Sequence, residues 1–249
     1  MNASRQLVPA FILPALFAAV AFGQTQSDVE RVIRLEHATT SEEVQQIATL
    51  TRAMTEVHDI RADAGSITLR GSAEQVALAE WLVREADKPA GFRAEPREHA
   101  IPGSGETLRV FNLADTDAPQ SLQEVATVVR SITEMRRLFT YPKAKALAVR
   151  GGADQLKLAE WLIGELDRPA SQTRSDSALF SYAAPDDTVR VFYLTPGESP
   201  RQLQDVAVSV RKTAGVRRLF TYNAPRAMVV RGTATQIARA EQLIQTRAR

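Results

Sequence analysis

The sequence has no cysteine among its 249 residues, and this absence removes several kinds of chemistry. Without thiols there are no disulfides, no thiolate metal sites, no cysteine nucleophile and no lipidated N-terminal cysteine. Histidine is scarce as well: His37, His58 and His99 all lie in the first half of the chain and do not recur at a fixed spacing. We therefore expect each histidine to be a solvated surface residue, and we expect no metal and no cofactor.

The sequence also lacks a large excess of either charge and lacks the common catalytic motifs. The formal net charge is +2, whereas nucleic-acid-binding proteins usually carry a basic surplus, so we expect no nucleic-acid partner. The patterns G-x-S-x-G, H-E-x-x-H and the P-loop do not occur. The adjacent acids Glu42-Glu43 and Asp186-Asp187 point apart, which favours roles at a helix start and in a turn. These features predict a protein that is not an enzyme.

One long apolar run is present, at the N-terminus. The stretch "MNASRQLVPAFILPALFAAVAFGQTQ" has a single cation, Arg5, and is then apolar from Leu7 to about Phe22 before small residues suited to cleavage. This plan is typical of a secretory signal peptide. A membrane anchor is less favoured, because the run is short for a span and holds two prolines. We expect residues 1–23 to be a cleaved signal peptide and the mature protein to reside in the periplasm or cell envelope.

The rest of the chain repeats itself. "RRLFTY" stands at 136–141 and again at 217–222, 81 residues later, and "LRVFNL" and "VRVFYL" recur at the same offset. A third copy lies upstream, because "SITLRGSAEQVALAEWLVREADKP" (66–89) matches "KALAVRGGADQLKLAEWLIGELDRP" (145–169). We expect units at 28–89, 108–169 and 189–249, joined by polar linkers at 90–107 and 170–188.

Each unit is predicted to run strand, helix, strand, strand, helix. Capping boxes such as Thr40-x-x-Glu43 precede the helices, and an Arg-Gly pair follows the third strand, where glycine permits a sharp turn. Each linker can also hold a short strand ("EHAI", "ALFSY") that forms a hairpin with the next unit. Trp81 and Trp161, replaced by Gln242 in the third unit, are expected to be core or helix–helix contacts. The expected fold class is α+β, with three tandem βαββα two-layer sandwiches after the signal peptide.

This order of motifs resembles a known family. A strand "R-V-[FI]-x-L", a capped helix, a strand pair ending "[LV]-[AV]-V-R-G-[ST]" and a helix closing on "[LA]-D-[KR]-P" are similar to the short N-terminal repeats of bacterial secretins. These repeats are also called NolW-like domains or ring-building motifs, and the resemblance covers nearly the whole mature chain. It implies non-catalytic periplasmic repeats that stack into rings and contact inner-membrane partners or the secreted substrate.

The same resemblance distinguishes the role of the secretin channel from the role of its N-terminal repeats in assembly. Secretins are the outer-membrane channels of type II and type III secretion and of type IV pili, and they continue into a glycine-rich β-barrel region that this sequence lacks. We therefore expect protein–protein assembly, through rings of the chain itself or docking to a secretin, pilus or secretion component, with outer-membrane association only through partners. The alternative is a monomeric periplasmic adaptor. KH folds share the βαββα order, but their Gly-x-x-Gly clamp between helices is missing here.

The repeated "RRLFTY" supplies the candidate interface. In a strand, Leu138 and Thr140 face one side while Phe139 and Tyr141 face the other. Two interpretations stay open: the aromatics belong to the core, or they and the flanking arginines form a surface for a neighbour, as such residue types often do. The first unit reads "VHDIRA" instead and is expected to act differently or as a cap. The candidate interface residues are Arg136, Arg137, Phe139, Tyr141, Arg217, Arg218, Phe220 and Tyr222.

Overall fold

The structure is a computed structural model that describes residues 28–89, 91–92, 94–116, 118–168, 177–181, 187–194, 199–223 and 226–247. The segment expected to be a signal peptide, residues 1–23, lies outside the described residues, as does most of the range 170–188. Within the described ranges, no helix combines the length and the apolar character needed to cross a bilayer.

Three α+β units follow one another, as the sequence predicted. Unit 1 consists of β1 (Val29–Arg34), α1 (Ser41–Met54), β2 (Asp59–Asp63), β3 (Ser66–Gly71) and α2 (Ala73–Ala86). Unit 2 consists of β4 (Arg97–Ala100), β5 (Thr107–Asn112), α3 (Pro119–Thr133), β6 (Arg137–Tyr141), β7 (Ala146–Gly151) and α4 (Ala153–Leu166). Unit 3 consists of β8 (Ala178–Ser181), β9 (Thr188–Tyr193), α5 (Pro200–Ala214), β10 (Arg218–Tyr222), β11 (Ala227–Gly232) and α6 (Ala234–Arg247).

Each unit has its own antiparallel sheet. The strand orders are β1-β3-β2 in unit 1, β4-β5-β7-β6 in unit 2 and β8-β9-β11-β10 in unit 3. The additional strands β4 and β8 fall within the ranges expected to be linkers, and each pairs with the following strand as a hairpin. Among the described residues, no strand pairs with the outer edge of β1.

The helices begin where the capping boxes predict. The hydroxyl of Thr40 accepts the N–H of Glu43 at 3.2 Å, and the Glu43 carboxylate accepts the N–H of Thr40 at 3.1 Å. The same reciprocal pair occurs at Ser72 with Gln75 and at Ser199 with Gln202. A short polar side chain before the first turn satisfies N–H groups that have no partner inside the helix.

A glycine ends the strand before the last helix of each unit, at Gly71, Gly151 and Gly232. The structure explains it by a close contact and not by the sharp turn that the sequence predicts. A Cβ atom on Gly151 would lie 2.8 Å from Oε1 of Gln155, and one on Gly232 would lie 2.6 Å from Oε1 of Gln236. The Gln155 oxygen accepts the N–H of Gly152 at 3.2 Å, so the capping glutamine fills the space that a side chain would need. Neither Gly151 nor Gly232 has a left-handed backbone, and an added side chain would instead displace the flexible end of the capping glutamine.

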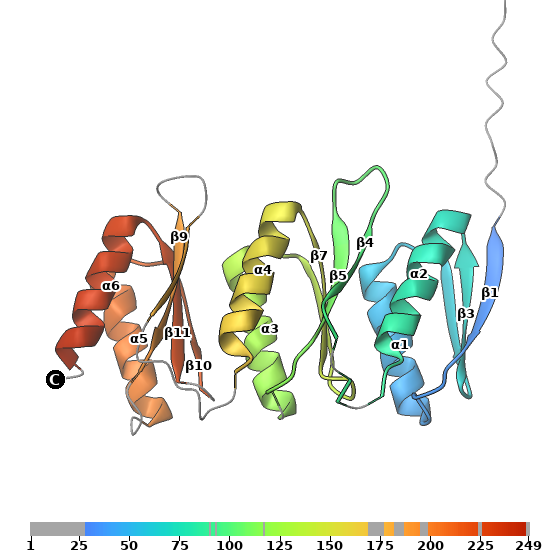
Figure 1. Cartoon of the computed structure of the whole chain (residues 1–249), viewed down its shortest axis with the longest axis horizontal. Helices are drawn as coiled ribbons and strands as arrows, with labels where there is room; N and C mark the ends of the chain where they lie inside the picture. Colours follow the sequence, from blue (N-terminus) through green and yellow to red (C-terminus); the bar gives the residue numbers. More distant parts are fainter. Residues whose placement is uncertain are drawn as a thin grey trace, which may run out of the picture.

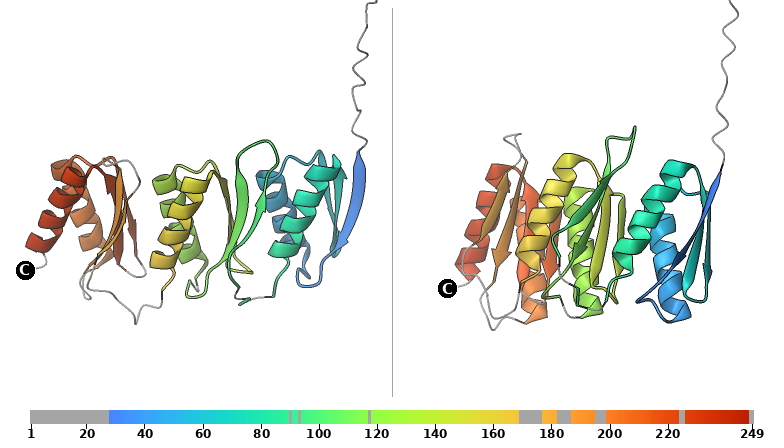
Figure 2. Two further views of the ribbon diagram at one scale, coloured as in Figure 1. Left: turned by 45° about the horizontal axis from the view of Figure 1, so that its top comes forward. Right: turned by 45° about the vertical axis from the view of Figure 1, so that its right-hand side comes forward.

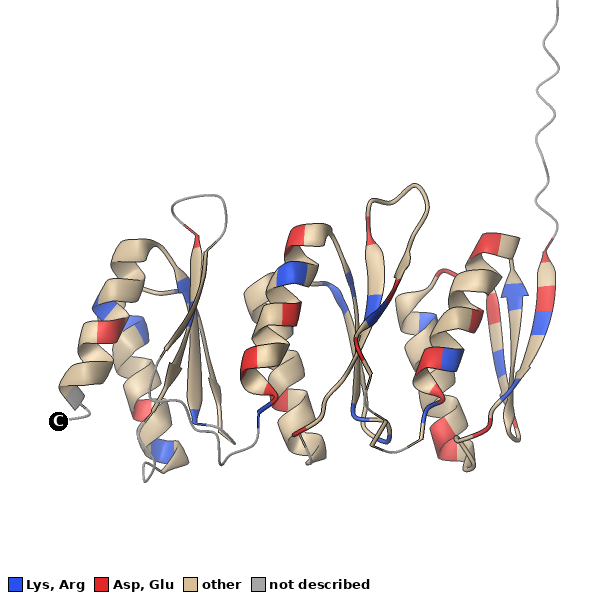
Figure 3. Cartoon of the chain, viewed as in Figure 1, with Lys and Arg blue, Asp and Glu red and all other residues tan. Residues whose placement is uncertain are grey.

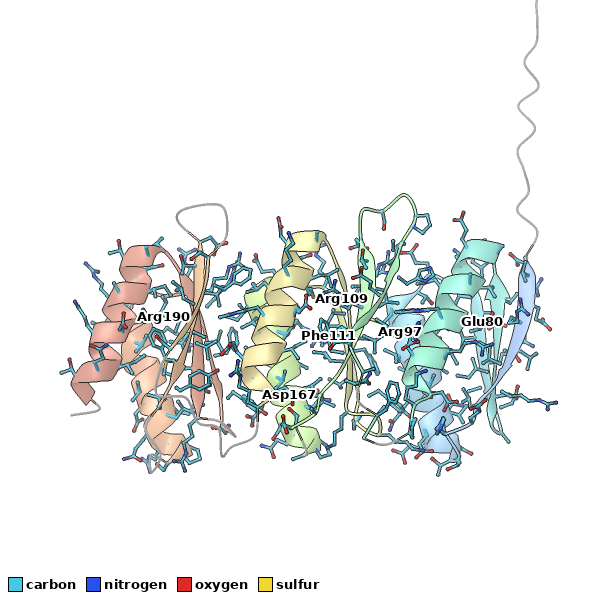
Figure 4. All side chains as sticks on the ribbon, in the orientation of Figure 1. Glu80, Arg97, Arg109, Phe111, Asp167 and Arg190 are labelled. Carbon is cyan, nitrogen blue, oxygen red and sulfur yellow. The ribbon has the colours of Figure 1, made fainter. Side chains whose placement is uncertain are left out.

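Inside each unit, an arginine on the strand before the first helix (β1, β5 or β9) meets a glutamate on the last helix. Arg109 donates to Glu160 at 2.7 Å and lies over the ring of Phe111, and Arg190 donates to Glu241 at 2.7 Å. Figure 4 shows Arg109 and Phe111 together between β5 and α4. The pair therefore fixes the helix over the sheet it covers.

The units stack in a row, so that sheets and helix pairs alternate along the molecule. Figure 1 shows the sheet of unit 1 at one end, then α1 and α2, then the sheet of unit 2, then α3 and α4, and so on to α5 and α6 at the other end. The two turned views in Figure 2 keep this alternation. The sheets of units 2 and 3 thus have helices on both faces, whereas no helix among the described residues covers the outer face of the unit 1 sheet.

Burial along the strands matches this arrangement. All six residues of β7 are buried: Leu147 and Val149 belong to the core cluster of unit 2, while Ala146 and Ala148 belong to the cluster of unit 1. In β3, the equivalent strand of unit 1, only the residues that face its own helices are apolar and buried, namely Ile67 and Leu69. A strand that is covered on both sides is apolar at successive positions.

We predict that Gly151→Ala destabilises the protein by about 1 kcal/mol, because the new methyl group displaces the capping side chain of Gln155. The control is Gly164→Ala in α4, where a Cβ has no neighbour within 4 Å. This exposed helical position should instead gain about 0.5–1 kcal/mol. Urea unfolding of both variants measures the difference, and equal effects would contradict the capping explanation.

Candidate functional site

The first "RRLFTY" stretch lies at the junction between units 1 and 2. Leu138 points into the core of unit 2, which decides between the two faces that the alternation left open. Phe139 and Tyr141 point the other way and pack against the core cluster of unit 1, which includes Leu50 and Met54 of α1. Tyr141 is only 2% exposed. The two aromatics are therefore neither the core of their own unit nor an exposed surface, because they are covered by the preceding unit of the same chain.

The second copy does the same at the next junction. Tyr222 is 2% exposed and belongs to the core cluster of unit 2, with Phe220 packed against that cluster. Val189 and Val191 of β9 join the same cluster, although they belong to the sheet of unit 3. Both "RRLFTY" stretches therefore pack their aromatic side chains against the helix pair of the preceding unit.

No unit precedes unit 1 among the described residues, and its equivalent strand lacks these aromatics. The register of β2 on β3 matches that of β6 on β7, so Arg61 stands where Phe139 stands and Asp63 where Tyr141 stands. Both residues are exposed. The free face of the first sheet is therefore charged, which explains why the first unit does not contain "RRLFTY".

Arginine residues bind each junction together. Arg150, whose side chain is 4% exposed, donates to Glu106 at 2.7 Å within unit 2. It also donates to the carbonyl of Met54 at 3.2 Å and to Glu56 at 3.3 Å, both in unit 1. Arg137 lies 3.2 Å from the same Glu56 carboxylate. A cation at the C-terminal turn of α1 also meets the negative end of that helix.

Unit 3 repeats this arrangement residue for residue. Arg231 donates to Asp187 at 2.8 Å and to the carbonyl of Ile132 at the end of α3, and Arg218 donates to Glu134. The hydrogen bond from Arg231 lowers the pKa of Asp187. Glu134 has a left-handed backbone with φ of 59°, a conformation that favours glycine, and Gly215 occupies the equivalent place in unit 3. Glu134 tolerates this backbone where the next unit supplies two arginines.

Two of the candidate residues are not part of the junctions. Arg136 and Arg217 are exposed, whereas the second arginine of each pair is half-buried between units. The two residues of the "RR" pair therefore differ in environment, although the sequence presents them as equivalent.

The tryptophans pack against the core clusters, as expected, and each also reaches a junction. The ring of Trp81 lies 5.4 Å from that of His99 on β4, and the ring of Trp161 lies 5.3 Å from that of Phe180 on β8. Each tryptophan thus contacts the hairpin strand of the following unit. Gln242 replaces them in unit 3, where no further unit follows in the described chain.

The two ends of the stack are polar. At the positions where units 1 and 2 place Leu50 and Val128, or Leu78 and Leu158, unit 3 has Ser209 and Arg239, respectively. Arg239 and Gln242 are exposed. Figure 3 shows acidic and basic residues along β1 and its neighbours at the opposite end. The apolar surfaces that join units are therefore confined to the interior of the stack.

Ion pairing and burial at the first junction shift two pKa values. The ammonium group of Lys143 bonds Glu43 at 2.7 Å and, with the backbone N–H of Thr40, lowers the pKa of this carboxyl to about 2. Burial, together with the charges of Glu43 and Asp87, raises the pKa of Tyr141 to about 12. The phenol of Tyr141 is thus held neutral beside an ion pair that crosses the junction.

The described residues offer little that is typical of a reaction site. One open pocket of about 400 Å³ lies beside β1 and α2 and is lined by residues such as Ile33, Leu35 and Trp81. Among the described side chains, no three histidine or carboxylate groups gather as metal ligands would. His37 is held by the Asp87 carboxylate through its backbone N–H, and His58 lies 3.4 Å from Asp28.

No protein-family model matches the sequence, and none of the curated proteins compared is similar to it. Solved structures do show similarity. The structure of XcpQN012 is 18% identical, covers 90% of this chain and 100% of its own, and has a TM-score of 0.29. The N-terminal domain of the secretin XcpQ from Pseudomonas aeruginosa is 15% identical, with coverages of 89% and 100% and a TM-score of 0.27.

Another similar structure is a complex of a/eIF2alpha, aDim2p and rRNA from Pyrococcus horikoshii, at 18% identity over 57% of this chain and 86% of the other, with a TM-score of 0.31. The chain spans about two-fifths of ExeD from Aeromonas hydrophila, 41% of its length, at 14% identity and a TM-score of 0.22. TM-scores this low do not support a conclusion about function.

Each unit has an arginine near the end of the strand before its last helix: Arg70, Arg150 and Arg231. We predict that this arginine contributes to stability only where another unit precedes it. Arg150→Gln and Arg231→Gln should each lower the free energy of unfolding by about 1.5–3 kcal/mol, because each removes a largely buried guanidinium group that bonds a helix carbonyl and partly exposed carboxylates. The matched control is Arg70→Gln, since Arg70 is exposed and no unit precedes it among the described residues. Chemical denaturation measures all three, and a loss at Arg70 as large as at Arg150 would refute this account.

We also predict that Tyr141 titrates far above an ordinary tyrosine. Because its folded pKa of about 12 exceeds the unfolded value of 10.0, its contribution to stability is complete below pH 10 and is lost as the pH rises towards 12. Ultraviolet titration of the wild-type protein should show a late phenolate component that Tyr141→Phe removes. If the variant loses a component near pH 10 instead, Tyr141 is not buried at the junction.

Proposed function

We propose that the protein is an exported, non-enzymatic component of the cell envelope that serves as a rod-shaped protein–protein assembly module. Its role is within a secretion or pilus machine of the secretin type. The observation that carries this proposal is the repeated junction. The same aromatic pair, arginine pair and acidic partners join unit 1 to unit 2 and unit 2 to unit 3.

Such a junction makes the spacing and orientation of the units fixed properties of the chain. The aromatic and arginine side chains that are most common in interfaces are used between units, and the apolar contact is continuous through the described stack. A rod of this kind presents its exposed edges and loops at set distances, which suits a protein that positions other proteins. The signal-like N-terminus and the resemblance of the motifs to secretin repeats support an envelope location.

A monomeric adaptor is the second candidate, and the polar end faces favour it. A ring in which Phe139, Tyr141, Phe220 and Tyr222 contact another copy is not supported, because the chain covers these residues itself. Further copies stacked end to end would set charged β2 residues such as Arg61 against Arg239 and Gln242 of unit 3. The two outer ends of the stack therefore lack the matching apolar surfaces that join units inside it.

The proposal predicts where the protein is and what it contacts. Mass spectrometry of protein from the periplasmic fraction should find a mature N-terminus near residue 24, and cross-linking in intact cells should join the chain to a secretin, pilus or secretion component. Arg231→Gln, which loosens unit 3, should reduce those cross-links more than Arg70→Gln does. Cytoplasmic protein that retains Met1 would contradict export, and the absence of any cross-link to such a component would contradict the assembly role.

A further inference from the structure

The outer edge of β1 is the place where unit 1 differs most from its successors. In units 2 and 3 the corresponding strand is covered at this edge by an antiparallel strand, with Val110 opposite Arg97 and Val191 opposite Ala178. By the repeat offset, Val32 is the equivalent residue of unit 1, and no described strand lies beside it. A sheet edge with free backbone donors and acceptors is a template for another strand.

The side chains of β1 define what this edge can accept. On the face turned away from the helices, Val32 is 59% exposed and lies between Glu30 and Arg34, which are also exposed. On the opposite face, Arg31 lies 3.4 Å from Glu80 of α2, and Ile33 is buried in the core. The exposed face therefore reads acid, valine, base, in a strand of six residues.

This order is complementary to itself in one antiparallel register. We propose that β1 pairs with β1 of a second copy about a two-fold axis at Val32. Each Val32 then lies opposite the other, and each Glu30 lies opposite the Arg34 of the second copy. Directly opposed apolar side chains and opposite charges are the pairs that stabilise antiparallel strands. A symmetric contact of this kind is the commonest way in which two identical chains associate.

The charges also select the register. A shift of two residues would place Glu30 opposite Val32, and a shift of four would oppose two glutamates or two arginines. Charges on an edge strand normally prevent pairing with arbitrary strands, so here they admit one partner and reject others. In the register that places Val32 opposite Val32, directly opposed side chains lie on the same face, so the helix layers of both copies lie on the same side of the joined sheet.

The pocket beside β1 supports the same occupant. It is lined by the apolar Ile33, Leu35 and Trp81 and also by charged side chains such as Arg34 and Arg84. In the register centred on Val32, Val29 of the second copy falls opposite Leu35, one of these lining residues. The pairing therefore brings an apolar side chain against the apolar part of the pocket lining. A contact built from one short strand and one such side chain is small, so the dimer dissociates on dilution.

This pairing goes beyond the proposed function, because it needs no secretion component and is tested on the purified protein alone. Sedimentation velocity over a range of concentrations should show a monomer–dimer equilibrium for the wild-type chain. Glu30→Arg and Arg34→Glu should each weaken the dimer by about tenfold, because each places like charges opposite one another twice. An equimolar mixture of the two variants should recover dimerisation, since every opposed pair is then complementary.

The control is Arg61→Glu, which makes the same change of charge as Arg34→Glu on the same face of the sheet but on β2, at the opposite edge from β1. It should leave the equilibrium unchanged. A wild-type chain that remains monomeric at all concentrations, single variants that dimerise as the wild type does, a mixture that does not recover, or an equal effect of Arg61→Glu would each overturn the pairing. None of these results depends on whether a secretion component is bound.

Discussion

The architecture depends on the burial of two sheets on both faces. In units 2 and 3 the face of the sheet that a two-layer sandwich normally leaves to solvent lies against the helices of the unit before it, with Tyr141 and Tyr222 at the centre of the contact. Units of this size bury little apolar surface on their own. The stacking joins three small cores into one continuous structure, and it explains why the central strands β7 and β11 are apolar at successive positions.

The ionic groups determine how the stacked layers are oriented. Apolar contact between a sheet and a helix pair tolerates some sliding, whereas Arg150 and Arg231 each reach one carbonyl at the end of a particular helix. The partner carboxylates come from both sides of the junction, so each arginine is satisfied only when the two units are in register. Burial of a guanidinium group without such partners would be costly. The arginines therefore stabilise the correct orientation of two adjacent units and disfavour other orientations.

Much of the fold could be predicted from the sequence, because capping boxes, strand alternation and an 81-residue offset are local or repetitive signals. The place of the aromatics could not, since alternation shows only that Phe139 and Tyr141 lie on the face opposite Leu138, and not which face covers the helices of the same unit. A signal was available in β5 and β7, where Leu108, Val110, Ala146 and Ala148 are apolar on the outer face and their unit 1 counterparts Glu30, Val32, Ser66 and Thr68 are mostly polar. The contacts of Trp81 and Trp161 with the next unit could not be predicted either, because no local pattern marks them.

The middle unit has a property that its neighbours lack. Its sheet fits a helix pair of the kind found in units 1 and 2, and its own helices carry Leu158 and Trp161, which suit a sheet of the kind found in units 2 and 3. Its two faces are therefore complementary to each other. A gene that duplicated this segment would encode a longer molecule with every new contact already satisfied, so the length of such a protein can change by whole units while both ends remain as they are.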